Sequence, residues 1–230
     1  MNYDAFLGLV KARRSFRSLK PDPIPDEFVE RIIEAARFAP SGANSQPWEF
    51  IVIKAQETKD KIVALLGEQA APRRKVELTR DEDLQYPGTQ GPAREPGFKN
   101  APVFIILCGD PRTKDAYPLL TKLTRGESHF VSGLANAFLY MAMAATTLGL
   151  GSQWVSATGS PIVQPLLKQL LDIPDGLAIY DMLVVGYPAT PPKERFVRER
   201  AEMVHYDRFD KAKYRNDQQI RDYIVHLRKG

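Results

Sequence analysis

The sequence predicts an α+β fold in a single domain of 230 residues. Segments with helical spacing of apolar residues mix with short runs of β-branched residues, and no strict strand-helix-strand repeat joins them. The length suits one domain, because single domains run to about 250 residues. A content of 43% hydrophobic and 26% charged residues is typical of a globular chain. We therefore expect residues 1–230 to form one domain.

The N-terminal part of the chain predicts two helices and a strand. Apolar residues recur at helical spacing over 3–10, which predicts a short helix that ends near a cluster of arginines. Asp26 is the expected N-cap of a second amphipathic helix, which ends at Pro40. Residues 48–54 are rich in β-branched side chains and predict a buried strand.

The rest of the chain predicts three further helices and two strands. The helices are expected at 58–66, 127–148 and 161–171, and the strands at 103–108 and 178–185. Residues 130–167 contain no charged residue, yet their polar side chains and glycines favour a buried central helix followed by a polar loop over a membrane span. We expect Trp154, which follows the central helix, to lie in the core.

Residues 67–100 carry prolines, glycines and charges over a length too great for a routine connector. We interpret this segment as a lid or binding loop that contains a short helix near residues 73–78. Such a composition suits a mobile cover over a binding site.

The charge pattern argues against a nucleic-acid-binding protein. The 32 basic residues are scattered among 28 acidic ones, apart from a dense basic cluster at 13–17. A nucleic-acid module would need a broader basic face with a recognised motif or stacking aromatics, and the sequence has neither. Residues 1–10 lack the basic start and the continuous apolar stretch of a signal peptide, so we expect a cytoplasmic protein.

The residue patterns that metal and hydrolytic chemistry need do not occur in the sequence. The three histidines lie far apart without metal-ligand spacing. The single cysteine, Cys108, lies in an apolar run, where we expect it to be buried and inert. The glycines at 149–151 lack the third glycine of a dinucleotide-binding fingerprint and follow a helix instead of a strand.

Two blocks near the N-terminus carry the strongest functional signal. In the loop 39–50, Pro40 disfavours helical geometry before it, and Gly42 permits backbone angles closed to other residues. The polar side chains of this loop that can donate or accept hydrogen bonds are Ser41, Asn44, Ser45 and Gln46. Arginine forks bind phosphate oxygens bidentately, so the cluster at 13–17 is a candidate phosphate site.

Together these blocks resemble the FMN-dependent nitroreductase family. Its chains open with an Arg-Arg-Ser-x-Arg phosphate motif, followed by a Pro-Ser-x-x-Asn-x-Gln-Pro-Trp loop. Two further blocks resemble the family in the expected order, namely the glycine turn at 149–154 and the Gly-Tyr-Pro segment at 186–188 with the Lys-Glu-Arg segment at 193–195.

The resemblance covers roughly residues 3–55 and 101–197. It leaves two segments unmatched, which we interpret as a lid or insertion at about 67–100 and a C-terminal extension at about 198–230. The extension, rich in aromatic and charged residues, is a candidate to wrap a partner subunit.

The resemblance implies a fold, a cofactor and a reaction. The fold is a central mixed or antiparallel sheet flanked by helices, in an intertwined homodimer. The cofactor is FMN, and NAD(P)H is the reductant. The reaction is a ping-pong reduction of a small organic acceptor, such as a nitroaromatic or a quinone.

The resemblance also assigns residues to the cofactor site. Its expected phosphate and ribityl contacts are Arg13, Arg14, Ser15, Arg17, Lys193 and Arg195. The loop expected to line the flavin ring or its substrate face, in this family often donated by the partner subunit, comprises Pro40, Ser41, Gly42, Ala43 and Asn44. The segment expected to supply backbone amides near the flavin ring comprises Ser156, Ala157 and Thr158. No residue is predicted to be catalytic, because the flavin carries the chemistry.

Three alternatives stay open. One is reductive dehalogenation or another specialised reduction, for which candidate substrate contacts, chosen by residue type, are Tyr86, Arg94 and Lys99. A second is the flavin-fragmenting branch related to cobalamin lower-ligand synthesis, which consumes FMN. The third is a flavin-binding or sensing protein without turnover.

Overall fold

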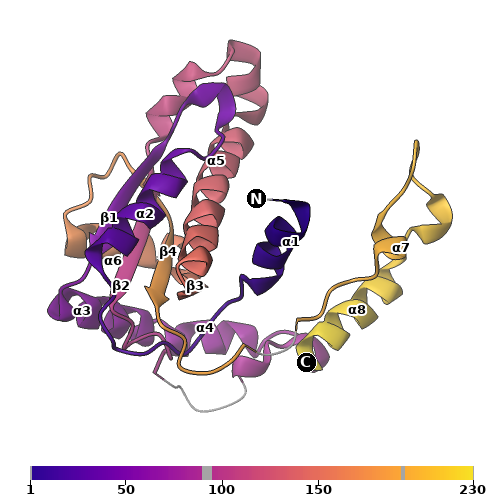
Figure 1. The fold of residues 1–230 in the computed structure, drawn as a ribbon. Helices are drawn as coiled ribbons and strands as arrows, with labels where there is room; N and C mark the ends of the chain where they lie inside the picture. The colour runs from indigo at the N-terminus through magenta and orange to yellow at the C-terminus, as the bar shows by residue number, and fades with distance from the viewer. Residues whose placement is uncertain (1, 90–94, 193–194, 230) are drawn as a thin grey trace. The chain divides into compact units, whose positions relative to one another are not determined.

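The structure is a computed structural model that describes residues 2–89, 95–192 and 195–229. Contacts divide the chain into two compact units. The first unit comprises Met1–Glu68 and Glu95–Pro192, and the second comprises Gln69–Arg94 and Lys193–Gly230. Figure 1 traces the elements of each unit.

The described part of the first unit is built on a four-stranded sheet. The strands are β1 (Trp48–Ile53), β2 (Val103–Gly109), β3 (Gly151–Val155) and β4 (Ala178–Gly186). They pair in the order β1-β2-β4-β3, and each of these pairings is antiparallel. The combination of helices with this sheet confirms the predicted α+β class. Of the two predicted sheet types, mixed and antiparallel, the antiparallel one is present.

Helices cover both faces of this sheet (Figure 1). They are α2 (Asp26–Arg37) and α5 (Leu119–Thr147) on one face and α3 (Gln56–Glu68) and α6 (Val163–Leu171) on the other. Helix α1 (Tyr3–Ala12) also belongs to the first unit, but it contributes no buried residue to either face. Successive residues of a strand point to opposite faces. Accordingly, Ile105 of β2 packs in the cluster that contains α2 and α5, whereas Ile106 packs in the cluster that contains α3 and α6. Burial on both faces explains why the strands read as continuous apolar runs.

The central helix is longer than the sequence predicts, and the segment after it differs. Helix α5 begins at Leu119 instead of residue 127. By length and composition α5 could cross a membrane, but its buried residues pack against α2 and the sheet. The predicted polar loop is wrong, because residues 151–155 form strand β3. Gly149, with a φ of 73°, ends the helix as a left-handed glycine, and the uncharged run continues as a partly buried strand.

The surroundings of Asp26 and Cys108 decide two local predictions. Asp26 does not cap α2; it is the first helical residue, and its carboxylate accepts a hydrogen bond from Lys54 at 2.7 Å. Cys108 is fully buried, and burial raises the pKa of its thiol to about 12, which confirms the expectation of an inert cysteine.

The described part of the second unit contains short helices from the predicted lid and from the C-terminal extension. They are α4 (Ala70–Glu77), α7 (Arg200–Met203) and α8 (Asp217–Lys229), with 3₁₀ turns at Glu82–Leu84, Pro87–Thr89 and Lys211–Lys213. Helix α4 confirms the short helix predicted near 73–78. Arg221 of α8 bonds to Asp81 at 3.0 Å and to Asp83 at 2.7 Å. The lid and the C-terminal extension are therefore tied together within this unit.

The last residues of the predicted lid belong to the first unit. Phe98 is buried there and packs edge-on against Phe104, with ring centroids 5.9 Å apart. The lid function of the segment stays a prediction, and Gln69–Arg94 is the part that lies outside the first unit.

Candidate functional site

The predicted phosphate cluster is attached to the free edge of the sheet. Ser15 forms a parallel bridge with Ser152, and the Phe16 N–H donates to the Ser152 carbonyl at 2.9 Å. Because β3 is an edge strand, its outer hydrogen-bonding groups are available for this pairing. A side chain at Gly151 would lie 2.8 Å from the Phe16 ring, so the glycine permits this close approach.

The chain after the arginines runs beside the segment that follows β4. The Lys20 N–H donates to the Tyr187 carbonyl at 2.8 Å, and the Ala189 N–H donates to the Ser18 carbonyl at 3.1 Å. Hydrogen bonds thus bring together three blocks that the sequence separates, at 13–17, 149–154 and 186–188.

The predicted phosphate contacts differ in their burial and in the unit to which they belong. Arg13 is the C-cap of α1, and both it and Arg14 are partly buried and engaged in interactions. Arg17 is exposed at the start of the segment that reaches Lys20. Arg195 belongs to the second unit, and Lys193 lies outside the described residues. The convergence of the two basic clusters on one phosphate therefore stays a prediction.

The polar loop after α2 holds an uncommon backbone conformation. Around the 3₁₀ turn Gly42–Asn44, positive φ angles occur at Ala43 (49°), Asn44 (51°) and Gln46 (44°). The Gln46 N–H donates to Ser41 Oγ at 3.0 Å and closes the loop. Such conformations are costly for non-glycine residues and cluster at functional sites.

Helix α5 supports this loop from one face. Asn136 Nδ2 donates to the Pro40 carbonyl at 2.9 Å. A Cβ at Gly133 would lie 3.2 Å from Ser41 Cβ, and a Cβ at Gly42 would lie 3.3 Å from His129 Nδ1. Residues three and four apart share one helix face. Asn136, Gly133 and His129 were missed by sequence reasoning, although their spacing in a long uncharged helix is a usable signal.

The predicted amide-donating segment is a 3₁₀ turn directly after β3. In this turn, Ser156–Gly159, Thr158 is fully buried and its Oγ1 donates to the Val155 carbonyl at 2.9 Å. A Cβ at Gly159 would lie 2.2 Å from the Tyr180 carbonyl oxygen, so the turn is in close contact with β4. Ser156 is exposed and Ala157 partly buried.

Trp154 is more exposed than the sequence predicts. Its side chain is 44% exposed, because β3 is an edge strand. One ring face packs against Phe138, with ring centroids 4.2 Å apart, and Nε1 donates to Asp181 Oδ2 at 2.5 Å. Sequence reasoning missed Asp181. Burial raises its pKa, while its hydrogen bonds from Trp154 and the Gly159 N–H act in the opposite direction.

The substrate candidates do not gather in one unit. Lys99 lies in the first unit and pairs with Glu95, whereas Tyr86 lies in the second, beneath the Arg228 guanidinium at 5.2 Å. Arg94 lies outside the described residues. Their role in substrate binding stays a prediction.

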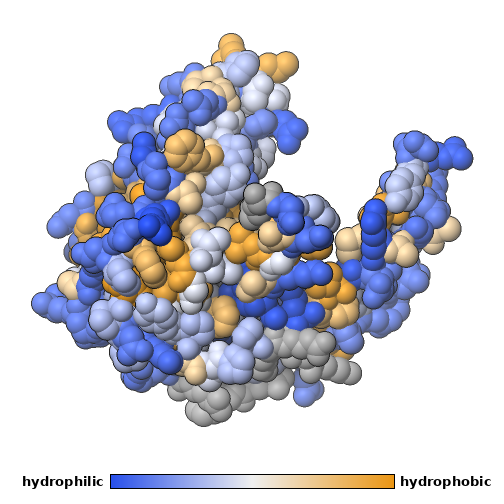
Figure 2. Space-filling view, viewed as in Figure 1, coloured by the Kyte–Doolittle hydropathy of each residue, from blue (hydrophilic) through white to orange (hydrophobic). Residues whose placement is uncertain are grey.

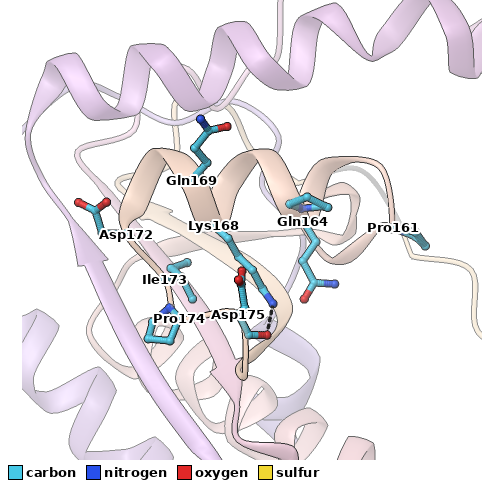
Figure 3. A pocket seen from close by; sticks show the side chains of 9 residues that line it. Pro161, Gln164, Lys168, Gln169, Asp172, Ile173, Pro174 and Asp175 are labelled. Carbon is cyan, nitrogen blue, oxygen red and sulfur yellow. Dashed lines mark hydrogen bonds between the residues drawn. The ribbon is translucent and has the colours of Figure 1, made fainter.

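A hollow of about 660 Å³ lies along α6 and is not the predicted site (Figure 3). Some of its polar groups already form hydrogen bonds within the chain. Lys168 Nζ donates to the Asp175 carbonyl at 2.9 Å, and Gln164 Oε1 accepts from the Ile179 N–H at 2.7 Å. It shares no lining residue with the Ser156–Gly159 turn.

Comparison with known proteins identifies the family. The model of the nitroreductase family matches residues 10–187. Iodotyrosine deiodinase of Haliscomenobacter hydrossis is 31% identical over 187 residues, which are 77% of this chain and 76% of that protein. FMN reductase (NAD(P)H) of Bacillus subtilis is 30% identical over 185 residues, which are 76% of this chain and 63% of that protein. A crystal structure of iodotyrosine deiodinase bound to FMN and 3-iodo-L-tyrosine matches with a TM-score of 0.69 at 24% identity, covering 88% of this chain and 99% of that one. The chain belongs to the nitroreductase family, as its sequence motifs predict.

Proposed function

We propose that this chain is an FMN-dependent oxidoreductase that uses NAD(P)H to reduce a small organic acceptor. The observation that carries the proposal is the attachment of the basic cluster at 13–17 to the edge of β3, the strand that leads into the Ser156–Gly159 turn. In this proposal, strand β3 would link the phosphate-binding residues, which attach at Ser152, to a turn with backbone amides that follows Val155. When bound, FMN would accept a hydride from NAD(P)H and pass electrons to the acceptor in a ping-pong cycle.

The residues present fit a phosphorylated and hydroxyl-rich cofactor. Arg13 and Arg17 offer guanidinium groups for a phosphate, and Ser15 offers a hydroxyl. Gln153 Oε1, on the same strand as Ser152, is buried and has no hydrogen-bond partner among the described residues. Buried polar atoms are rarely left unpaired, so this oxygen suits a hydroxyl donor from the cofactor.

The chain's own residues would bind and orient the cofactor. The basic cluster would fix the phosphate end, and the Ser156–Gly159 turn would hold backbone donors towards the ring, where oriented dipoles favour developing negative charge. The loop 41–46 is kept in its shape by α5 before any substrate arrives, which reduces the entropy lost on binding. A cytoplasmic location belongs to this proposal, since NAD(P)H is available there.

A homodimer is part of the proposal. Helix α1 has no buried residue within the described part of the chain, and its Tyr3 is 71% exposed. At the start of α5, Leu119, Leu120 and Leu123 are each at least 70% exposed. Figure 2 has exposed apolar side chains at that end of the helix, at the top of the view. Apolar surface of this kind is typical of a protein interface.

The dimer can be tested by light scattering coupled to gel filtration. Leu123→Glu should convert a dimer into a monomer, because it introduces a charge into the interface. Arg125→Glu, an exposed change on the same helix, is the control. A wild-type monomer would contradict the proposed dimer.

Reductive dehalogenation is the second candidate function. It is favoured by the relative named iodotyrosine deiodinase, which is 31% identical over 77% of this chain. The two candidates share the cofactor and differ in the acceptor. They can therefore be separated only by measuring which acceptor oxidises the reduced protein.

The test begins with the purified protein, which should be yellow and release FMN, not FAD, on denaturation. NAD(P)H added without oxygen should bleach the flavin, and a nitroaromatic, a quinone and 3-iodotyrosine should then be compared as acceptors. Fast reoxidation by nitroaromatics or quinones supports the first function, and iodide release from 3-iodotyrosine supports the second. A protein that binds no FMN would end both, and one that binds FMN but is not reduced by NAD(P)H would be a flavin binder.

A further inference from the structure

Asp181 is a buried carboxylate in an apolar strand. It is 8% exposed, and its neighbours along β4 include the buried residues Ile179, Met182 and Leu183. No ion pair to Asp181 occurs within the described residues. A buried carboxylate without a cation is costly, and natural sequences break a local pattern in this way mainly at functional sites.

The hydrogen bonds of Asp181 reach both ends of one short segment. Trp154 Nε1 donates to Oδ2 at 2.5 Å, and the Gly159 N–H also donates to the carboxylate. Trp154 lies near the end of β3, and Gly159 closes the turn that follows it. One side chain of β4 thus holds residues 154 and 159, which flank the predicted amide-donating residues.

Steric contacts restrict the same turn. The position of a Cβ at Gly159 would be 2.2 Å from the Tyr180 carbonyl oxygen and 3.1 Å from Asp181 Oδ1. The Thr158 hydroxyl donates to the Val155 carbonyl and fixes the interior of the turn. The two hydrogen bonds to Asp181 add a link from the turn and the end of β3 to β4.

We propose that Asp181 is a positioning residue that holds the Ser156–Gly159 turn, through the Trp154 indole and the Gly159 amide, in the orientation in which its backbone donors face the cofactor ring. This inference rests on the proposed function, because the turn matters to catalysis only if FMN binds beside it. Asp181 itself does not touch the cofactor in this proposal. Its effect passes through the turn.

The first experiment tests the hydrogen bond without cofactor. The chain has two tryptophans, so a ¹⁵N-labelled sample gives two indole resonances, and Trp154→Phe identifies one of them. A short bond to a carboxylate should shift the Trp154 indole proton downfield. Asp181→Leu should move this resonance towards the position of a water-exposed indole. An unchanged resonance would overturn the proposal.

The second experiment measures bound FMN. Asp181→Leu should shift the visible absorption bands of bound FMN, lower kcat more than it changes KM, and weaken FMN binding about tenfold, the scale of one hydrogen bond to a charged group. Asp181→Asn retains an oxygen acceptor and should restore most of these properties. Ile62→Ala, a fully buried site on α3, is the control that lowers Tm and leaves the FMN spectrum unchanged.

The outcomes separate this proposal from the proposed function. If wild-type protein binds FMN and Asp181→Leu only lowers Tm, as Ile62→Ala does, the positioning role is refuted and the proposed function stands. If wild-type protein binds no FMN, both are refuted. Should Asp181→Leu fail to fold, Trp154→Phe removes the indole donor alone; the same spectral shift supports the proposal, and an unchanged spectrum overturns it.

Discussion

Gly97→Ala should destabilise the first unit and weaken cofactor binding. A Cβ at this position would lie 2.1 Å from the backbone carbonyl oxygen of Arg17 and 3.2 Å from its carbonyl carbon. Because the neighbouring atoms belong to the backbone of Arg17, the contact cannot be relieved by a change of rotamer. Either residue 97 or the segment that carries Arg17 must move. Overpacking of this kind costs about 1–3 kcal/mol of folding free energy.

The displacement should also reach the phosphate site. Moving Arg17 by enough to accommodate a methyl group would lengthen a charge-assisted hydrogen bond to the cofactor phosphate, and such a bond is worth about 1.5–3 kcal/mol. We therefore expect FMN to bind about tenfold or more weakly, since about 1.4 kcal/mol corresponds to a factor of ten. Urea unfolding followed by circular dichroism measures the first effect, and fluorescence titration of FMN measures the second.

Gly67→Ala is the matched control. Gly67 lies in α3, and a Cβ there would meet nothing within 4 Å. Alanine at this site should be neutral or stabilise the protein by up to about 1 kcal/mol, because glycine is a poor helix former. If Gly97→Ala is as stable as Gly67→Ala and binds FMN equally well, then the contact between residue 97 and Arg17 does not position the phosphate site.

Three further predictions concern the second unit and Asp181. Arg195→Ala should weaken FMN binding by about 1.5–3 kcal/mol with the fold intact, whereas a surface residue without a role would change the affinity by less than about 0.5 kcal/mol in fluorescence titration. Replacing residues 76–94 by a Gly-Ser linker should leave the protein yellow and reducible by NAD(P)H, but it should lower kcat/KM for the preferred acceptor more than for a quinone. The replacement stops before Phe98, which is buried. A colourless product would refute the lid function of this segment. Burial raises the pKa of Asp181 in the folded state, so ionisation of this carboxyl opposes folding. The stability of the wild type relative to Asp181→Asn should therefore be greatest below the usual aspartate pKa. It should fall as the pH rises through the raised pKa. Urea unfolding of both proteins across this pH range checks the sign, and a difference that rises with pH would contradict it.

The local elements of this fold follow from periodicity in the sequence. Helices at 3–12, 26–37 and 56–68 and strands at 48–53 and 103–109 agree with the prediction to within a few residues, because amphipathic spacing and β-branched runs are local properties. The motif at 13–17 and the loop at 39–50 likewise identified the family, which the match to residues 10–187 confirms. Arginines, glycines and side-chain amides at fixed spacing carry this information without any tertiary contact.

Tertiary structure alone decided how these elements meet. Strand β3 was missed because an uncharged run after a helix fits a loop as well as a buried strand, and only its pairing with β4 distinguishes them. The bridge between Ser15 and Ser152 joins residues that lie 137 positions apart, and the bond from Trp154 to Asp181 depends on the order of strands in the sheet. No local pattern encodes such contacts, because they form only when the sheet brings its edge, the basic cluster and the turn together. The sequence by itself therefore determined the family and most elements, whereas packing of the sheet determined which residues support the site.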